Sequence, residues 1–495
     1  MLIAAIPVKN YLDAKDKIKQ VIAQIDGVEL RLDYLDRLNL DEIDQLRREF
    51  SIPLIFVLRK QSQGGYYPRE ESHRLSQLLA LCALKPDYLD LEYDTPNDFI
   101  ATLKRQFPDI KLIKSYHHFN ETPLNLAALL QSMQDPHCHS YKIAVKANST
   151  LDALRMLAFI QQHPNVRLTG ISMGEYGQCT RVLSPIIGNE FHYASLNESE
   201  RTAPNQLTVT DLLSTYHFRQ LNRQTKVYAL LGDPIHLSLG HILHNQVIRL
   251  LGKNAVYIKL RVTPEELPET LPLCRRLPFH GFSVTMPLKE TIVPLLDQIE
   301  PSSLPIRAIN TVHLQQQKYI GSNTDGLGAI QALSATIPVR NQKLLILGAG
   351  GAARAIAYEA HRQQAQVIIV NRTLDRAKKI ADELPCEAYE LNNSDVQKIP
   401  YTAIINTLPE KAYSDPGVKE FIQSLLPRRL AMEIVYHPIF TPFVRLAQQA
   451  GCVCIPGYAM YINQALLQHQ RWFNPNENQQ NEIRNLLKNR FSMRG

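Results

Sequence analysis

The sequence has few cysteines, no long apolar run and no strong excess of one charge, and each of these shortages excludes a class of protein. The seven cysteines are an odd number and form no Cys-x-x-Cys pair, which argues against a disulfide framework or a structural zinc site. No apolar run approaches the length of a membrane span, and the start MLIAAIPV lacks the basic region of a secretory signal. We therefore expect a cytoplasmic protein in a reducing compartment, without membrane association.

The formal net charge of +7 comes from scattered lysines and arginines. The chain has no basic run and no basic patch interleaved with aromatic residues, so we expect no nucleic-acid partner. A mild positive balance instead suits small anionic ligands. His137, Cys138 and His139 could bind a metal in principle, but they follow a Gln-Asp-Pro loop and no further ligand is near them in sequence. A surface loop is the better interpretation, and we predict no metal site.

The length of 495 residues predicts two or three domains. Residues 1–222 alternate short apolar strands with amphipathic helical stretches, and the strand candidates are LIAAIPV, VELRLDYL, PLIFVLR, YLDLEY, KLIKSYHH, YKIAVKA, VRLTGISM and FHYASL. Eight such units in about 220 residues are typical of a compact (β/α)8 barrel, whose ligand site lies at the carboxyl ends of the strands. Several polar residues follow this rule, because they lie in or just after the strands: Glu29, Arg31, Arg59, Glu92, His117 and Lys142.

Lys142 is the most informative of these residues, because it places an amine inside the apolar strand YKIAV. Charged residues in a barrel can neutralise one another, and this alternative accounts for Glu29 and Arg31 but not for Lys142. An amine removed from water loses its proton more readily and can attack a ketone to form an imine. His117 could then remove a proton next to the iminium carbon, because strand alternation points His118 to the opposite face.

Five stretches of this region, VELRLDYL, LRKQSQGG, SYHHF, YKIAVKANS and RTAPNQ, resemble type I 3-dehydroquinate dehydratase over nearly all of residues 1–222. The resemblance implies an imine between Lys142 and the ketone of 3-dehydroquinate, with His117 as general acid and base. It also implies a late loop that acts as a lid and a substrate pocket formed by Glu29, Arg31, Arg59, Arg181, Thr202 and Gln206. Of these, Arg59 and Arg181 would hold a carboxylate. Gln63 and Thr202 stand where the family usually has Glu and Ser.

The second half contains the run LLILGAGGAARAIAYEA at residues 344–360, followed by the strand VIIV. An apolar strand, a glycine turn, an alanine-rich helix and a second strand in this order predict a dinucleotide-binding domain of Rossmann type. Gly348 turns the chain, and Gly350 and Gly351 lack a Cβ, so a pyrophosphate can approach the N–H groups at the start of the helix. Ala352, the next residue, is a further candidate for cofactor binding. A plain strand–helix turn is the alternative, and the complete order of elements argues against it.

The residues after the second strand indicate which dinucleotide binds. NAD sites usually place an acidic residue there, whereas this chain has Asn371, Arg372 and Thr373. A guanidinium can bind the 2′-phosphate of NADP, so we predict NADP as the cofactor. In the alternative, Arg372 is a solvated arginine and Asp375 binds the ribose 2′-hydroxyl of NAD. Asp375, however, lies a few residues too late in the sequence for this contact.

The segments LLGDPIHLSLGHILHN, GFSVTMPLKE, AINTVH, GSNTDGLG, MEIVYHPIFTPF and IPGYAMYINQAL resemble shikimate dehydrogenase and, with the glycine turn, span residues 227–470. In one cleft, Lys289 and Asp325 can relay a proton as a hydride moves, although a salt bridge without catalysis is the alternative. The resemblance implies cofactor contact by Gly457, and binding of the hydroxyls and carboxylate of shikimate by Ser238, Thr285, Asn310 and Gln464. Gly240 and Ser283 stand where the family usually has Ser and Asn.

We therefore expect an α/β chain with a barrel over residues 1–222, a shikimate-binding subdomain over 227–335, a Rossmann-type NADP subdomain over 336–460, and C-terminal helices over 461–495 that return to the substrate subdomain. It would dehydrate 3-dehydroquinate to 3-dehydroshikimate and reduce this with NADPH to shikimate. A quinate-preferring dehydrogenase is one alternative, and a metabolite-sensing regulator is another, which the retained catalytic candidates argue against. Oligomeric state, orientation of the halves and channelling stay open.

Overall fold

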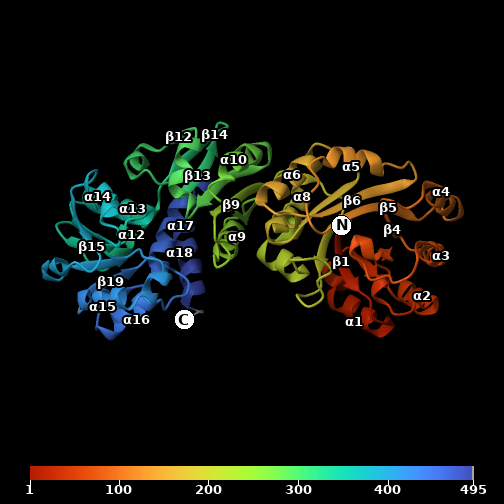
Figure 1. Ribbon diagram of the computed structural model, residues 1–495, viewed down its shortest axis with the longest axis horizontal. Helices are drawn as coiled ribbons and strands as arrows, with labels where there is room; N and C mark the ends of the chain where they lie inside the picture. The colour runs from red at the N-terminus through yellow and green to blue at the C-terminus, as the bar shows by residue number, and fades with distance from the viewer. Residues whose placement is uncertain (428, 493–495) are drawn as a thin grey trace. The chain divides into compact units, whose positions relative to one another are not determined.

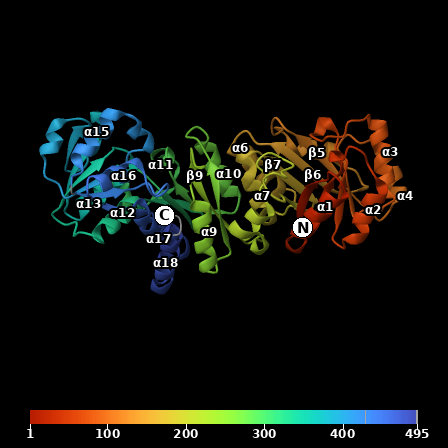
Figure 2. The same ribbon diagram turned by 90° about the horizontal axis from the view of Figure 1, so that it is seen from below.

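The computed structural model describes residues 1–427 and 429–492, and the chain forms two compact units. The first consists of residues 1–227 with 254–279, and the second of residues 228–253 with the described residues from 280 onwards. Figures 1 and 2 label the helices and strands of each unit. Among the described residues, no helix has both the length and the apolar character needed to cross a membrane.

The first unit contains eight parallel strands in the order β7-β6-β5-β4-β3-β2-β1-β8, which form a nearly closed barrel. The strands are β1 Leu2–Pro7, β2 Gly27–Arg31, β3 Leu54–Val57, β4 Tyr88–Glu92, β5 Lys111–His118, β6 Cys138–Lys146, β7 Leu168–Met173 and β8 His192–Ser195. All eight strand candidates of the sequence are present. The predicted barrel is therefore confirmed.

Helices separate the strands, and local sequence sets where they begin. They are α1 Tyr11–Val21, α2 Leu40–Glu49, α3 Glu71–Cys82, α4 Asn97–Gln106, α5 Leu126–Met133, α6 Thr150–Gln161, α7 Gln178–Val182 and α8 Ser184–Ile187. The start of α6 shows most clearly how side chains cap the first turn of a helix. The Ser149 side chain accepts a hydrogen bond from the N–H of Asp152, and the Asp152 carboxylate accepts one from the N–H of Ser149.

Strand register explains why charged residues face the barrel interior. Neighbouring residues of parallel strands point to the same side, and Glu29 of β2 lies in register between Ala5 of β1 and Ile55 of β3. Asp90 of β4 is in register with Val57 of β3. Ala5, Ile55 and Val57 belong to the apolar interior cluster, so Glu29 and Asp90 also point inward. The barrel thus places buried carboxylates beside an apolar core.

The barrel has a seam between β7 and β8, defined here by Gly170 and Leu168 on one side and Asn189 and Glu190 on the other. The strand order ends at these two strands, so no ladder joins them among the described residues. Instead the Asn189 side chain accepts from the N–H of Gly170 at 2.9 Å and donates to its carbonyl at 3.0 Å. The N–H of Glu190 donates to the carbonyl of Leu168 at 2.9 Å. A side-chain amide therefore replaces part of the missing ladder.

Downstream of the barrel, a six-stranded mixed sheet has the order β10-β9-β11-β13-β14-β12. Its strands are β9 Lys226–Gly232, β10 Ala255–Arg261, β11 Phe279–Val284, β12 Gln298–Ile299, β13 Thr311–Gln315 and β14 Lys318–Ser322. The helices of this region are α9 Gly240–Leu250, α10 Leu267–Arg276 and α11 Leu288–Thr291. The turns after β11 and β14 lead directly to Lys289 and Asp325, respectively.

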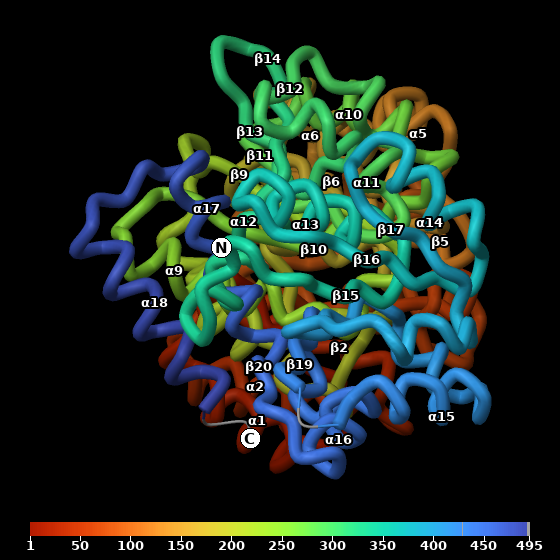
Figure 3. Tube along the Cα trace, turned by 90° about the vertical axis from the view of Figure 1, so that its left-hand side faces the viewer, coloured from red at the N-terminus to blue at the C-terminus, as the bar shows by residue number. Residues whose placement is uncertain are grey.

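A parallel sheet follows with the order β17-β16-β15-β18-β19-β20, the strand order of a Rossmann domain. Its strands are β15 Lys343–Leu347, β16 Gln366–Asn371, β17 Cys386–Glu390, β18 Ala403–Asn406, β19 Leu430–Glu433 and β20 Val453–Ile455. The helices are α12 Asp325–Ser334, α13 Gly351–Arg362, α14 Leu374–Ala381, α15 Pro416–Leu425 and α16 Pro442–Gln449. Figure 3 shows α12 and α13 on one side of the sheet and α15 and α16 on the other. This confirms the predicted dinucleotide fold.

Two long helices, α17 Gly457–Phe473 and α18 Glu477–Ser492, end the described chain. The α18 residues Ile483, Leu487 and Phe491 are buried in a cluster with Leu243 and Val247 of α9. The apolar spacing of the C-terminal segment therefore makes one face of a packed helix. Its polar remainder faces solvent, as the amphipathic pattern indicates.

A buried pair of histidines, one in α9 and one in α17, is expected to make the stability of the second unit depend on pH. Nδ1 of His244 and Nε2 of His469 lie 3.1 Å apart, burial lowers the pKa of His244 to about 3, and burial with the neighbouring imidazole holds the pKa of His469 well below its usual value. In the unfolded chain both rings protonate near pH 6.5. Stability is therefore complete above that pH and is lost as the pH falls. We expect the second unit to be about 3 kcal/mol less stable at pH 5.5 than at pH 7.5.

Urea unfolding at the two pH values tests this prediction. The single tryptophan, Trp472, reports on this region because its ring lies 5.6 Å from that of His244 and 5.7 Å from that of His469. His469→Gln should roughly halve the loss of stability on acidification. The exposed His361→Gln should leave it unchanged. A full acid loss in the His469 variant would contradict the assignment.

Candidate active sites

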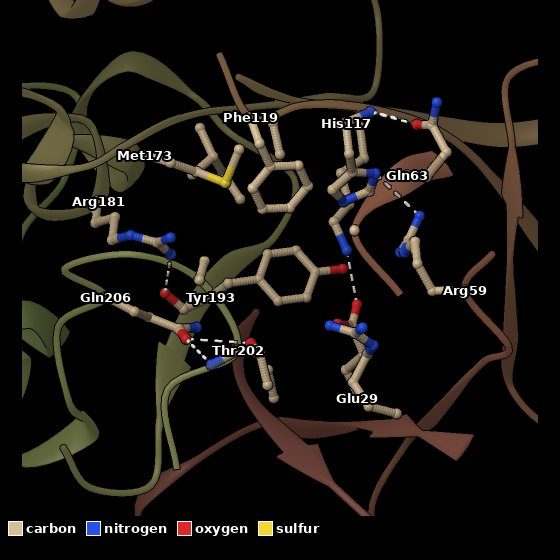
Figure 4. Close-up of a pocket in the computed structure, with 17 residues that line it drawn as sticks. Glu29, Arg59, Gln63, His117, Phe119, Met173, Arg181, Tyr193, Thr202 and Gln206 are labelled. Atoms are coloured by element: carbon tan, nitrogen blue, oxygen red, sulfur yellow. Dashed lines mark hydrogen bonds and ion pairs between the residues drawn. The ribbon is translucent and has the colours of Figure 1, made fainter. Parts of the chain in front are cut away.

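A pocket at the carboxyl ends of the barrel strands brings the predicted dehydratase residues together (Figure 4). The predicted residues that line it are Glu29, Arg31, Arg59, His117, Lys142, Arg181, Thr202 and Gln206. They come from strands β2, β5 and β6, from the segment after β3, from α7 and from the loop after β8. All of them lie at the carboxyl-terminal side of the strands, as a barrel site requires. Glu92, the remaining polar residue of the strand pattern, is not part of the lining. It is buried and pairs with Arg74 at 2.5 Å.

Lys142 lies in a cluster of charges rather than in the apolar surroundings that its strand suggested. Its Nζ is 2.7 Å from Oε2 of Glu29 and 3.2 Å from Oδ2 of Asp90. All three side chains are almost completely buried. The strand sequence YKIAV describes neighbours along β6, whereas these carboxylates come from β2 and β4. A charged amine is thus stabilised by ion pairs, and it needs a base before it can attack a carbonyl.

His117 is held by Arg59 and surrounded by positive charge. Nη1 of Arg59 lies 3.0 Å from Nδ1 of His117, and Nη2 of Arg59 lies 3.0 Å from Oδ1 of Asp90. Burial, followed by the charges of Arg59, Lys142 and Arg31, holds the pKa of His117 well below its usual range. The ring is therefore neutral at neutral pH. Because a guanidinium only donates, Nδ1 accepts and the ring carries its proton on Nε2.

Gln63 contacts the main chain of His117, not its ring. The amide oxygen of Gln63 accepts from the N–H of His117 at 2.7 Å. Residue 63 therefore fixes the position of the strand end. His118 lies outside the pocket lining, and its Nδ1 contacts the main chain of Glu121 at 3.2 Å.

The late loop and a buried arginine form the opposite wall. Oε1 of Gln206 accepts from both the N–H and the hydroxyl of Thr202, at 3.0 and 3.1 Å. Arg181 is buried, and burial lowers its pKa to about 10. Its Nη1 donates to the carbonyl of Tyr193 at 3.1 Å, and no carboxylate of the described residues forms an ion pair with it. A buried guanidinium of this kind suits an anionic ligand.

Sequence reasoning missed three members of this site: Asp90, Ser115 and Tyr193. Ser115 donates to Asp90 at 2.6 Å and accepts from Arg59 at 2.7 Å, so it links two charged groups. The alternation of YLDLEY places Asp90 on the same face as Glu92, which was a usable signal. The same alternation places Ser115 on the face of His117, two residues further along β5, so a signal for it was also present.

In the second unit, Lys289 and Asp325 meet as the sequence pattern required. Nζ of Lys289 lies 2.5 Å from Oδ2 of Asp325, and Nδ2 of Asn310 donates to the other carboxylate oxygen at 2.7 Å. Oε1 of Gln464 lies 3.4 Å from both Nδ2 of Asn310 and the hydroxyl of Thr324. One hydrogen-bonded group therefore joins four elements around the lysine.

Ser238, Thr285 and Ser283 lie in different settings. The hydroxyl of Ser238 lies 3.3 Å from that of Tyr436 and accepts from the N–H of Gly240 at 3.2 Å. Thr285 is half-buried at the end of β11, and its N–H is bonded to the main chain. Ser283 is buried and donates to Gln468 at 3.2 Å. Its hydroxyl is thus engaged within the protein.

The glycine turn fits a dinucleotide phosphate. Gly348 has φ +108°, which favours glycine, and a Cβ there would lie 2.3 Å from the hydroxyl of Thr407. Around Gly350 nothing lies within 4 Å of a Cβ position, and α13 begins at Gly351 with no side-chain cap. Its first N–H groups are open to an anion. A Cβ on Gly351 would lie 3.7 Å from Cδ of Lys289, so the turn and the lysine are neighbours.

The remaining cofactor candidates lie around this turn. Ala352 is half-buried in the first turn of α13. Asn371 ends β16 and donates to the carbonyl of Thr373 at 2.9 Å, while Arg372 is exposed beside it. Asp375, the acidic residue that an NAD site would require, lies in the first turn of α14. A Cβ on Gly457 would lie 2.0 Å from the carbonyl of Val435, so this glycine permits a close chain approach.

Three family models match the chain. The type I 3-dehydroquinase model matches residues 2–223, the shikimate dehydrogenase substrate-binding domain matches 230–312, and the shikimate/quinate 5-dehydrogenase model matches 331–405. The shikimate biosynthesis protein AroDE of Chlamydia pneumoniae is 34% identical over 475 residues, which cover 96% of this chain and 95% of that protein.

Two further proteins extend the comparison. The chloroplastic bifunctional 3-dehydroquinate dehydratase/shikimate dehydrogenase of Arabidopsis thaliana is 31% identical over 468 residues, which cover 90% of this chain and 77% of that protein. The crystal structure of shikimate dehydrogenase from Aquifex aeolicus matches with 31% identity and a TM-score of 0.50, and covers 54% of this chain and 99% of that one. The chain therefore belongs to the family of bifunctional 3-dehydroquinate dehydratase/shikimate dehydrogenases.

Proposed function

We propose that this chain catalyses two consecutive reactions of the shikimate pathway, the dehydration of 3-dehydroquinate and the NADPH-dependent reduction of 3-dehydroshikimate to shikimate. The observation that carries this proposal is that two separate clusters exist, one around Lys142 in the barrel and one around Lys289 beside the glycine turn. Each cluster contains a nucleophile or proton carrier together with hydrogen-bonding groups for a small polar anion.

In the barrel, imine formation begins with proton transfer from the ammonium of Lys142 to Glu29, the nearest acceptor at 2.7 Å. The free amine forms a C–N bond with the ketone carbon, and the ketone oxygen leaves as water. The resulting iminium makes the adjacent C–H acidic, so a base can remove that proton and then pass it to the substrate hydroxyl, which leaves as a second water. Hydrolysis of the imine releases the product and restores Lys142.

We assign the role of base to His117, which is neutral and lies in the same pocket. Its Nδ1 accepts a hydrogen bond from Arg59. Binding of the substrate carboxylate by Arg59, together with the unpaired Arg181, would draw the guanidinium from the ring and free Nδ1. Substrate binding would therefore leave Nδ1 of His117 able to accept a proton.

In the second unit, the glycine turn at residues 348–351 would hold NADP, which would supply hydride transfer at the carbon that bears the reacting oxygen. Lys289 supplies or accepts the matching proton at that oxygen, and Asp325 holds the lysine 2.5 Å away. Asn310 and Gln464 orient the same carboxylate and present polar atoms to the substrate. We propose that Ser238 and Thr285 bind the substrate carboxylate and hydroxyls.

A coupled assay tests both activities in the full chain. Addition of 3-dehydroquinate and NADPH should give loss of nicotinamide absorbance, and 3-dehydroshikimate alone should give it without the first step. Borohydride added with 3-dehydroquinate should leave a ligand-sized mass on the peptide that contains Lys142. Absence of absorbance change with both substrates would refute the bifunctional assignment.

Cofactor selectivity is proposed to rest on Arg372. Arg372→Ala should weaken NADPH binding by on the order of 1.5–3 kcal/mol, because a guanidinium–phosphate contact is lost, and should leave NADH binding nearly unchanged. Titration of protein fluorescence with each nucleotide measures both. Arg376→Ala, an exposed arginine in α14, is the matched control and should change neither. Equal losses of affinity for NADPH and NADH in the Arg372 variant would show that Arg372 does not set cofactor selectivity.

We further propose the domain boundaries 1–222, 227–335, 336–460 and 461–495, and a cytoplasmic location. The family-model matches at 2–223, 230–312 and 331–405 lie within or close to these boundaries. All seven cysteines are free, and this supports a reducing compartment.

A further inference from the structure

Tyr193 is a buried phenol in the barrel pocket that the roles described above leave unused. It lies in β8 and is 5% exposed. Nζ of Lys142 lies 4.1 Å from the centroid of its ring. In Figure 4 the side chain extends from β8 into the pocket, and its hydroxyl lies between His117 and Glu29. The phenol therefore faces the amine that forms the imine.

The hydroxyl of Tyr193 has no hydrogen-bond partner of normal geometry among the described residues, although it is fully covered. A buried hydroxyl without a partner destabilises the folded state. Glu29 lies near this hydroxyl and acts on it electrostatically, but it forms no hydrogen bond of normal geometry with it, and its Oε2 already binds Lys142. Arg181 binds the carbonyl of Tyr193 itself. The free hydroxyl is thus available to a group that enters the pocket.

The same surroundings keep the phenol protonated. Burial, followed by the negative charges of Glu29 and Asp90, raises the pKa of Tyr193 well above its usual value. A neutral phenol in this position offers an O–H donor over the whole working pH range. An oxygen that gains negative charge beside Lys142 would be its natural acceptor.

We propose that Tyr193 donates a hydrogen bond to the ketone oxygen of the substrate while Lys142 attacks the ketone carbon. As the C–N bond forms, the π electrons of the C=O bond move to oxygen, where the phenol stabilises the charge. Tyr193 keeps its proton throughout. The two protons that leave in water come from the ammonium of Lys142, one of them by way of Glu29, so the step needs no further reactant. The inference rests on the proposed dehydratase function.

The test compares Tyr193→Phe with Tyr88→Phe in the full chain. Tyr88 is a buried tyrosine of the barrel core that lies outside the pocket lining, so its variant should behave as the wild type. In Tyr193→Phe, the rate of borohydride-trapped imine formation in a single turnover should fall roughly 10- to 100-fold. KM should change little, and the melting temperature should stay the same or rise, because an unpaired buried hydroxyl has been removed.

The outcomes separate this inference from the function on which it rests. Imine formation in Tyr193→Phe at the wild-type rate would overturn the role of Tyr193 and leave the dehydratase proposal intact. An equal slowing in Tyr88→Phe would also overturn it, because a general effect on the barrel would then explain both variants. Failure of the wild-type chain to form any adduct at Lys142 would instead overturn the proposed dehydratase function.

Discussion

Lys142→Met is expected to abolish the dehydration of 3-dehydroquinate and to leave the reduction of 3-dehydroshikimate at its wild-type rate. Methionine keeps the length of the side chain but has no nitrogen to form the imine, so the rate should fall by on the order of 10⁴-fold or more. Glu29 loses a partner, whereas Asp90 keeps Arg59 and Ser115. A separate assay of each half-reaction measures the effect, and circular dichroism confirms that the variant is folded.

Lys146→Met is the matched control, since it removes an amine from the last residue of the same strand, outside the pocket lining. It should retain dehydration. Borohydride labelling at Lys146 in the wild type, or residual dehydration in Lys142→Met, would show that another amine forms the imine. Loss of both activities in Lys142→Met would show that the two units do not work independently.

Lys289→Met should have the reverse effect, with reduction lowered by about 10²- to 10⁴-fold and dehydration unchanged. The loss should appear in kcat, because the missing group handles the proton in the chemical step, while the affinity for NADPH depends on the glycine turn. Asp325→Asn should give a smaller loss, since Asn310 can still contact residue 325. Steady-state kinetics with 3-dehydroshikimate and NADPH measures both variants.

Lys343→Met provides the comparison for this half, because Lys343 begins β15 at the opposite end of the strand from the turn. It should keep full reductase activity. If Lys289→Met changes only the KM for NADPH, the lysine binds the cofactor and does not move the proton. The salt bridge to Asp325 would then have the structural role that the sequence left open.

Much of the fold was predictable because its signals are local. Each barrel strand is a short apolar run, and the glycine turn between β15 and α13 depends on residues that are adjacent in sequence. The pocket residues of the barrel were also predictable, because parallel strands bring their carboxyl ends to one face. Periodicity and topology together therefore predicted that Glu29, Arg31, Arg59, His117 and Lys142 share one pocket, whereas Arg181, Thr202 and Gln206 were expected only from the family resemblance.

The surroundings of each residue were not predictable in the same way. Lys142 is 113 residues from Glu29 and 52 from Asp90, so the strand sequence suggested an apolar environment where the fold supplies two carboxylates. The partner of Gln63 could not be read from its own segment either, because it is the main chain of His117, 54 residues further along the chain. Contacts across the barrel depend on the register of strands that are distant in sequence, so they cannot be predicted from any single segment.

The seam between β7 and β8 has a consequence for the mechanics of the barrel. Strands β2 to β6 are each held by a ladder on both sides, whereas β8 is laddered only to β1 among the described pairs. Local opening requires least free energy where main-chain hydrogen bonds are fewest. The wall that carries Tyr193 and Arg181 is therefore the compliant side of the pocket, while Glu29, Asp90 and Lys142 stand on the stiff side. We therefore expect any widening of the barrel for a ligand to occur on this flank, with little change in the spacing of the reactive charges on the other.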